Sequence, residues 1–149
     1  MHHFAYRNGV LHCEDVSLEA VARELGTPAY VYSDATLRRH YRMLADAFTG
    51  RDVLIAFAVK ANSNIGVLAT LAAEGAGADV VSGGEMLRAL EAGIPASRIV
   101  FSGVAKTAEE MKLGLERGIH QFNVESLPEL RRLSAVAAEL GKRAPIAFR

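Results

Sequence analysis

Five short apolar runs recur along most of the chain at nearly even spacing. Counting from the start of one run to the start of the next gives 25, 21, 22 and 24 residues, which suits a strand, a helix and two short loops. The runs are nearly continuous rather than alternating, as is typical of parallel strands covered on both faces. The sequence therefore predicts five strand–helix units, with strands at Val53–Val59, Ala78–Ser82, Ile99–Gly103, Gln121–Glu125 and Pro145–Arg149.

Signals for helix starts and stops stand between the runs. Ser82, Thr107 and Ser126 are each followed three residues later by a glutamate. This is the form of a capping box, in which the hydroxyl accepts from the third amide and the glutamate accepts from the amide of the cap residue. Glycines stand where the helices would end, because glycine adopts the left-handed C-cap geometry without a penalty. These are Gly75, Gly93, Gly118 and Gly141.

A regular series of strand–helix units forms either a (β/α)8 barrel or an open doubly wound sheet. The even spacing favours the barrel, and so does the lack of a Gly-x-Gly-x-x-Gly turn after the first run. A barrel needs eight strands, and a sheet that stopped at Arg149 would leave an open edge. We therefore expect an α/β fold, a partial (β/α)8 TIM-type barrel of parallel strands, in part of a longer protein.

The head, residues 1–51, differs in style from the rest of the chain, and we expect a domain boundary between residues 1–34 and residues 35–149. Alternating residues flank the turn signal Asn8-Gly9, which predicts a β-hairpin. The sequence then predicts a helix closed by Gly26, a short strand, and a second helix capped by Asp34. The first helix and the strand are expected at Ser17–Leu25 and Ala29–Tyr32.

Charge and composition exclude several classes of protein. Lysine and arginine together number 17, as do aspartate and glutamate, so there is no excess of positive charge for nucleic acid or a membrane surface. We see no secretion signal and no apolar run near the roughly 20 residues of a membrane helix. Cys13 is the only cysteine, which fits a reducing cytosol. We therefore expect a cytoplasmic protein, and we expect no metal because His12, His40 and His120 have no partners at metal-ligand spacing.

Reacting groups in a (β/α)8 barrel project from the carboxyl ends of the strands, and Lys60 stands at the end of the first run. Six apolar residues precede it, and partial burial there would disfavour the charged form of the amine. A neutral amine is what Schiff-base formation requires. The alternative is a lysine that ends a strand and extends its amine to water. Position alone does not separate the two.

Three further polar groups are expected at the same edge. Asp79 lies inside an apolar run, so its carboxylate needs a partner, which Lys60 or Arg149 could provide, or it belongs to a structural ion pair. Glu85 is explained by helix capping. Arg149 is either directed at the site or a loose chain end. The Ser82-Gly83-Gly84 turn could bind a phosphate, although a capped turn explains it equally well.

Seven motifs stand in order along the chain. Those of the head are Phe4–Tyr6, Gly9–His12 and Gly26–Tyr32, and those of the predicted barrel are Ala58–Asn64, Gly77–Glu85, Ile99–Lys106 and Phe122–Ser126. The barrel motifs resemble those of PLP (pyridoxal 5'-phosphate)-dependent decarboxylases of the alanine-racemase-like fold, fold type III. The head is similar to the opening of the bacterial diaminopimelate decarboxylase family, whereas related ornithine and arginine decarboxylases share the lysine motif but not this head.

This resemblance implies roles for four residues. Lys60 would bind PLP covalently, and Asp79 would lie beside it and set its charge and orientation. Arg149 would end a strand near the cofactor, and Glu85 corresponds to a glutamate of the family motif. The implied reaction of the full-length protein is decarboxylation of meso-diaminopimelate to L-lysine, in lysine biosynthesis.

The resemblance also implies that residues 1–34 join a C-terminal β-domain absent from this chain, and that the full-length protein is a homodimer. We expect the 149 residues alone to be inactive. The alternatives are another fold type III decarboxylase, acting on ornithine, arginine or carboxynorspermidine, an amino-acid racemase, a non-catalytic PLP-binding paralogue, or a barrel piece that binds no PLP.

Overall fold

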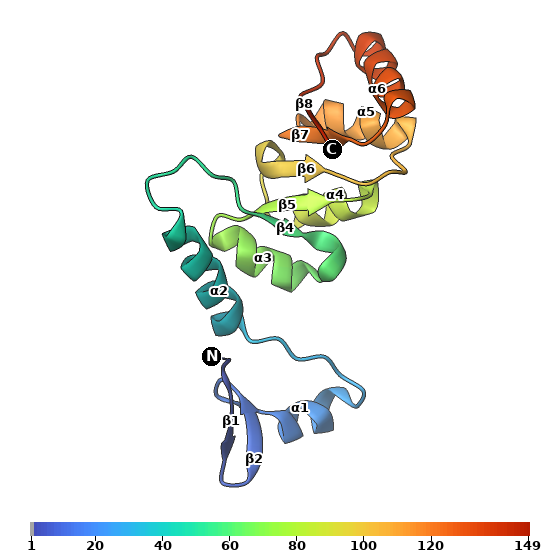
Figure 1. Ribbon diagram of the computed structural model, residues 1–149. Coiled ribbons are helices and arrows are strands. Elements are labelled where there is room, and N and C mark those ends of the chain that lie inside the picture. Colours follow the sequence, from blue (N-terminus) through green and yellow to red (C-terminus); the bar gives the residue numbers. More distant parts are fainter. Residues whose placement is uncertain (1) are drawn as a thin grey trace. The chain divides into compact units, whose positions relative to one another are not determined.

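The computed structural model describes residues 2–149, and the chain divides into two compact units between Thr49 and Gly50. Figure 1 shows the elements of both units. This division lies later than the predicted boundary after residue 34. The predicted boundary concerns a β-domain that this chain does not contain, and it stays a prediction.

The first unit begins with the predicted hairpin. Strands β1 (Phe4–Arg7) and β2 (Val10–Cys13) pair in antiparallel fashion. Asn8 and Gly9 between them have φ angles of 50° and 81°, the left-handed pair that a type I′ turn requires. The hairpin prediction is confirmed, and a short strand β3 (Val16–Ser17) extends the sheet.

Two helices complete this unit. Helix α1 (Leu18–Leu25) begins after Ser17 and ends at Gly26, as predicted. Helix α2 (Asp34–Ala47) is capped by Ser33 rather than Asp34, because the Ser33 hydroxyl accepts from the Thr36 amide at 3.0 Å. The strand predicted at Ala29–Tyr32 is wrong, since these residues pair with no strand in the described chain.

A carboxylate joins the hairpin end to the second helix. Oε1 of Glu14 accepts from the Ser33 hydroxyl at 2.7 Å and from the Ala35 amide at 3.0 Å. These two bonds, the Ala35 amide first, hold the pKa of Glu14 below its usual value. The residue has a φ of 54°, so a rarely populated backbone conformation aims its side chain at the helix start.

The second unit contains a five-stranded parallel sheet. Its spatial order is β4-β5-β6-β7-β8, the same as its chain order. A doubly wound sheet reverses its strand order at a switch point, so this order supports the predicted barrel-type fold. The strands overlap the predicted runs but are shorter: β4 (Ala56–Ala58), β5 (Gly77–Val80), β6 (Ile99–Phe101), β7 (Gln121–Val124) and β8 (Ile146–Phe148).

Helices follow the first four of these strands. They are α3 (Ile65–Ala73), α4 (Gly83–Glu91), α5 (Ala108–Arg117) and α6 (Leu127–Glu139). Short 3-10 turns lie at η1 (Val59–Ala61) and η2 (Ala96–Arg98). All four glycines predicted at helix ends have positive φ angles, between 62° and 92°, which confirms them as stop positions.

The core of this unit lies between the sheet and its helices. Alternate strand residues are fully buried there, namely Ala78, Val80, Ile99, Phe101 and Phe122. The rings of Phe101 and Phe122 stack with centroids 6.0 Å apart. The strand residues between these positions are less buried and include Asp79, Gln121 and Asn123. In the described chain, helices therefore cover one face of the sheet, and the other face carries these polar side chains together with Val100, the register partner of Asp79 and Gln121.

The capping-box prediction is right for one helix and partly wrong for two. At α5, Thr107 and Glu110 form the reciprocal pair. At α4, Glu85 accepts from the Val81 amide, one residue before the cap Ser82, at 2.8 Å. Glu129 of α6 likewise accepts from the Glu125 amide at 3.1 Å. The serine caps are fully extended, with φ near −154° and −160° against −79° at Thr107, so we infer that the preceding amide faces the helix.

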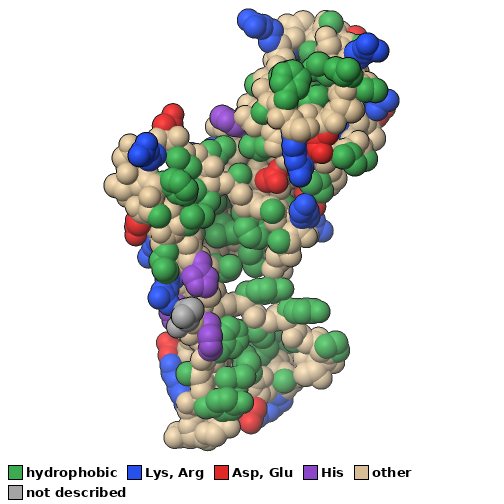
Figure 2. Space-filling view, viewed as in Figure 1, with side chains coloured by type: hydrophobic (Ala, Val, Ile, Leu, Met, Phe, Trp, Pro, Cys, Tyr) green, Lys and Arg blue, Asp and Glu red, His purple; other side chains and the backbone are tan. Residues whose placement is uncertain are grey.

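Acidic and basic side chains are interspersed on the face of the second unit that Figure 2 shows. This agrees with the balanced charge of the sequence.

Among residues 2–149, no helix combines the length and apolar character needed to span a membrane.

Candidate active site

Lys60 lies in the 3-10 turn that directly follows β4. Val59 beside it is fully buried in the core, whereas Lys60 is exposed. Within these residues it is thus Val59, and not the lysine, that enters the core, and the predicted partial burial of Lys60 in the full-length protein stays a prediction. Within residues 2–149 its amine has no hydrogen-bond or ion-pair partner, which leaves it available to react.

Asparagines fix the backbone after Lys60. The Asn62 side chain accepts from the Asn64 amide at 3.0 Å. Oδ1 of Asn64 in turn accepts from the Gly66 amide at 2.8 Å and so caps α3. Arg88 of α4 donates to the Ser63 carbonyl at 3.3 Å. These contacts make the path from strand to helix well defined, which holds the lysine at the carboxyl edge of β4.

Asp79 lies on the neighbouring strand at the same edge. Its register partner is Ala58, two residues before Lys60. The sequence analysis expected Lys60 or Arg149 as the partner of its carboxylate. The partner is instead the hydroxyl of Ser102, which donates to Oδ1. Ser102 accepts from Nδ2 of Asn123 at 2.9 Å. A hydroxyl from the adjacent unit therefore takes the place that the sequence assigned to a cation.

Arg149 pairs with a different carboxylate. Its Nη1 lies 3.0 Å from Oε1 of Glu125, and the Gly103 amide donates to the same oxygen at 2.7 Å. The Gly103 bond, and to a smaller extent the charge of Arg149, hold the pKa of Glu125 below its usual value although burial opposes them. The Arg149 amide also binds the Val124 carbonyl at 2.9 Å. The residue is thus anchored rather than a loose end.

Glu85 and the glycine turn beside it serve the helix start. The Glu85 carboxylate accepts from the Val81 amide, and the Glu85 amide donates to Ser82. The Gly83 amide donates to Oε1 of Glu110 at 2.8 Å. Carboxylate and hydroxyl oxygens thus already occupy these amides, which argues against a phosphate cradle at this turn.

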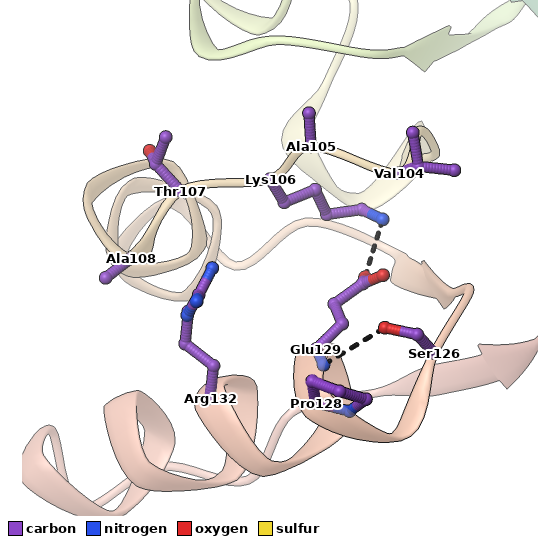
Figure 3. Close-up of a pocket in the computed structure, with 9 residues that line it drawn as sticks. All are labelled: Val104, Ala105, Lys106, Thr107, Ala108, Ser126, Pro128, Glu129 and Arg132. Atoms are coloured by element: carbon purple, nitrogen blue, oxygen red, sulfur yellow. Dashed lines mark hydrogen bonds and ion pairs between the residues drawn. The ribbon is translucent and has the colours of Figure 1, made fainter.

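A second lysine near the strand ends proves to be structural. Lys106 is fully buried, and its amine contacts Oε1 of Glu129 and the carbonyls of Gly103 and Asn123, each at 2.7 Å. Figure 3 shows the lysine and the glutamate pointing toward each other. Both are among the residues that line a cleft of about 400 Å³. An ammonium group has three donors, and all are used. Of the two lysines, only Lys60 offers a free amine.

The sequence analysis did not identify this ion pair. Its members are 23 residues apart, which is close to the length of one strand–helix unit. Equivalent positions of successive units lie side by side in a parallel sheet, so that spacing was the available signal.

The residues at this edge fit a cofactor that attaches to an amine. Lys60 supplies an exposed amine without a partner. Beside it, the sheet face carries the hydrogen-bonded side chains of Asp79, Ser102 and Asn123. Such a face suits a polar aromatic ligand better than an apolar one. An apolar ligand would remove the polar side chains of the face from water without offering them a hydrogen bond.

Comparisons with known proteins give one consistent family. Residues 34–149 match the family described as "Pyridoxal-dependent decarboxylase, pyridoxal binding domain". The chain is 58% identical over 147 residues to a diaminopimelate decarboxylase of Pseudomonas fluorescens, covering 98% of this chain and 35% of that protein. The chain thus spans about a third of the length of this relative.

Solved structures agree. A diaminopimelate decarboxylase from M. jannaschii in complex with L-lysine superposes with a TM-score of 0.93 at 38% identity, covering 98% of this chain and 35% of that one. A lysine/ornithine decarboxylase from Vibrio vulnificus complexed with cadaverine is more distant, with a TM-score of 0.77 at 26% identity, covering 89% and 35%. The similarity is therefore greater to the first of these two groups.

Proposed function

Because this chain belongs to the family of pyridoxal-dependent decarboxylases, through its pyridoxal-binding domain, we propose that the full-length protein converts meso-diaminopimelate to L-lysine and carbon dioxide. The observation that carries this proposal is the free amine of Lys60 at the carboxyl edge of β4, beside the strand that bears Asp79. The relative that is 58% identical bears the name of this activity, and the M. jannaschii relative was solved with L-lysine bound.

Lys60 is the residue that we assign to covalent attachment of PLP. When bound, PLP supplies an electron sink for the bond to the departing carboxyl group. The task of this chain is to hold and orient. The exposed Lys60 amine would hold the cofactor through its aldehyde, and the asparagine turn after the lysine fixes its backbone. Asp79 lies on the adjacent strand and orients the groups around the amine.

Arg149 and Glu85 take supporting roles in this proposal. The guanidinium of Arg149, held by Glu125, offers a positive charge at the same edge of the sheet. Glu85 acts through the helix start, since its carboxylate binds the Val81 amide two residues after Asp79. Its contribution is to fix the backbone of β5 as it leaves the sheet.

The test compares substrates and one lysine substitution in the full-length protein. Carbon dioxide release should be far faster from meso-diaminopimelate than from ornithine or arginine. Borohydride reduction of the PLP-loaded protein should fix the pyridoxyl group to its lysine as a stable label. Peptide mapping should then find this label on Lys60. Lys60→Ala should abolish label and activity, while Lys112→Ala, an exposed lysine of α5, should leave both unchanged. Faster turnover of ornithine, or a label elsewhere, would overturn the assignment.

We also propose that the full-length protein is a cytoplasmic homodimer. The similarity of its motifs to the decarboxylase family supports both parts of this proposal. The cytoplasmic location is also supported by Cys13, the single cysteine of this chain, which is a buried free thiol. The molar mass measured by light scattering after gel filtration should equal that of two subunits, and a monomeric mass would contradict the proposal.

A further inference from the structure

We propose that Ser102 and Asn123 are positioning residues that hold the Asp79 carboxylate in place for the chemistry at Lys60, an inference that rests on the function proposed above. The three side chains come from successive units of the sheet. Asp79 lies on β5, Ser102 directly follows β6, and Asn123 lies on β7.

The hydrogen bonds along this row all run toward Asp79. Nε2 of Gln121 donates to Oδ1 of Asn123 at 2.8 Å, and Nδ2 of Asn123 donates to Oγ of Ser102 at 2.9 Å. A serine hydroxyl has one proton, and here it goes to Oδ1 of Asp79. Donors aligned in one direction polarise one another and strengthen the row as a whole.

Both intermediate residues are fixed by their own backbones. The Ser102 amide donates to the Val80 carbonyl at 2.8 Å, and the residue is only 4% exposed. The carbonyl of Asn123 accepts from the buried Lys106 amine at 2.7 Å. The hydroxyl and the amide that act on Asp79 are therefore held before any ligand binds, which is what a positioning residue requires.

The arrangement engages one carboxylate oxygen and spares the other. Oδ1 of Asp79 binds Ser102, whereas Oδ2 has no hydrogen-bond partner in the described part of the chain. Removing the Ser102 hydroxyl would take away the hydrogen bond that holds this rotamer of Asp79, so that the side chain could populate others. Removing the Asn123 amide would loosen Ser102 and so act on Asp79 only indirectly.

The experiment uses the full-length protein with Ser102→Ala, Asn123→Ala and the double variant. The control is Ser126→Ala, which removes the cap of α6 and costs stability without touching the row. Three quantities are measured for each variant: the dissociation constant of pyridoxal phosphate from the apoprotein, by titration, and kcat and KM, from steady-state kinetics.

Ser102→Ala should raise the pyridoxal phosphate dissociation constant and lower kcat, each by about tenfold, with KM little changed, because misplaced groups lose orientation rather than substrate contact. Asn123→Ala should change both quantities in the same direction by less. The double variant should resemble Ser102→Ala, since both substitutions act along one path.

Two results would overturn the inference. One is a Ser102→Ala protein that behaves like Ser126→Ala in the dissociation constant and in kcat. The other is a double variant whose effects equal the product of the single ones, which would mean that Asn123 does not act through Ser102. If the wild-type protein bound pyridoxal phosphate but failed to decarboxylate meso-diaminopimelate, the proposed substrate would fall. The comparison of dissociation constants would still decide the role of Ser102.

Discussion

Lys106 and Glu129 form an ion pair with Nζ 2.7 Å from Oε1 and almost no exposure of either side chain. The lysine belongs to the loop after β6, and the glutamate belongs to the first turn of α6. Because the amine also binds the Gly103 and Asn123 carbonyls, one side chain joins this loop to the next strand and the next helix.

Lys106→Met should therefore destabilise the full-length protein by about 3–5 kcal/mol, the range for breaking a buried pair by removing one partner. The substitution leaves Oε1 of Glu129 buried without its charge partner. Urea unfolding followed by fluorescence or circular dichroism measures the loss. Lys112→Met, at a lysine that is 57% exposed, should change the free energy of unfolding by less than about 0.5 kcal/mol. Equal effects of the two would contradict the importance of the pair.

Glu110 links two helix starts, because its carboxylate accepts from the Thr107 amide at 2.9 Å and from the Gly83 amide at 2.8 Å. Glu110→Ala should cost about 1–3 kcal/mol of stability, since it leaves two amides without acceptors. Glu109→Ala, at the exposed neighbouring glutamate, is the matched control and should cost less than about 0.5 kcal/mol. Hydrogen exchange should show faster opening at both helix starts for the first variant only.

Gly114 lies against the core inside α5, where an added Cβ would come 2.7 Å from Cζ of Phe122 and 3.1 Å from Cδ1 of Ile119. Gly114→Ala should destabilise the fold by about 1–3 kcal/mol through overpacking. Gly84→Ala makes the same change in α4, where the nearest atom would be 3.9 Å away. That variant should gain up to about 1 kcal/mol from helix propensity. Thermal unfolding of the pair compares the two, and a stabilised Gly114→Ala would refute the packing argument.

The carboxylate of Glu14, which accepts from the Ser33 hydroxyl and the Ala35 amide, should make the start of α2 sensitive to acid. Its pKa is lowered on folding from an ordinary value of 4.5, so its contribution is present above that value and is lost as the pH falls through the lowered one. Hydrogen exchange of the peptide that contains Ala35 should therefore speed up, relative to an unfolded reference, as the pH drops below 4.5.

In Glu14→Gln this additional acid dependence should disappear, because an uncharged amide has no proton to gain. Asp15→Asn is the control, since Asp15 is exposed and pairs with Arg7 at the surface. An acid response that survives in Glu14→Gln would show that another group causes it.

Local sequence signals predicted the elements that depend on neighbours in the chain. Asn8-Gly9 specifies its hairpin turn through positive φ angles, and Gly118 ends α5 in the left-handed conformation. Both follow from the backbone preferences of single residues. The chain-ordered sheet was predictable for a different reason, namely the even spacing of the apolar runs and the lack of a Gly-x-Gly-x-x-Gly turn after the first run.

What the sequence did not predict depends on partners from other units. Nothing near Asp79 indicates that its partner is Ser102, which lies 23 residues away, directly after the next strand. The exposure of Lys60 in this chain was not predicted because the apolar run was expected to form a strand as far as Val59, whereas the strand ends at Ala58 and a 3-10 turn follows. The strand expected at Ala29–Tyr32 failed since pairing needs a second strand, which local residues do not supply.

The alternation along β7 makes the sheet intolerant of a change in length. Phe122 faces the helices, and Gln121 and Asn123 on either side of it face away. One inserted residue would slip the register by a single position and turn every later side chain to the opposite side. An asparagine would then lie in the apolar layer, and a bulky apolar side chain would take its former place beside Ser102. Insertions and deletions should therefore be tolerated in the loops between units but not within this strand.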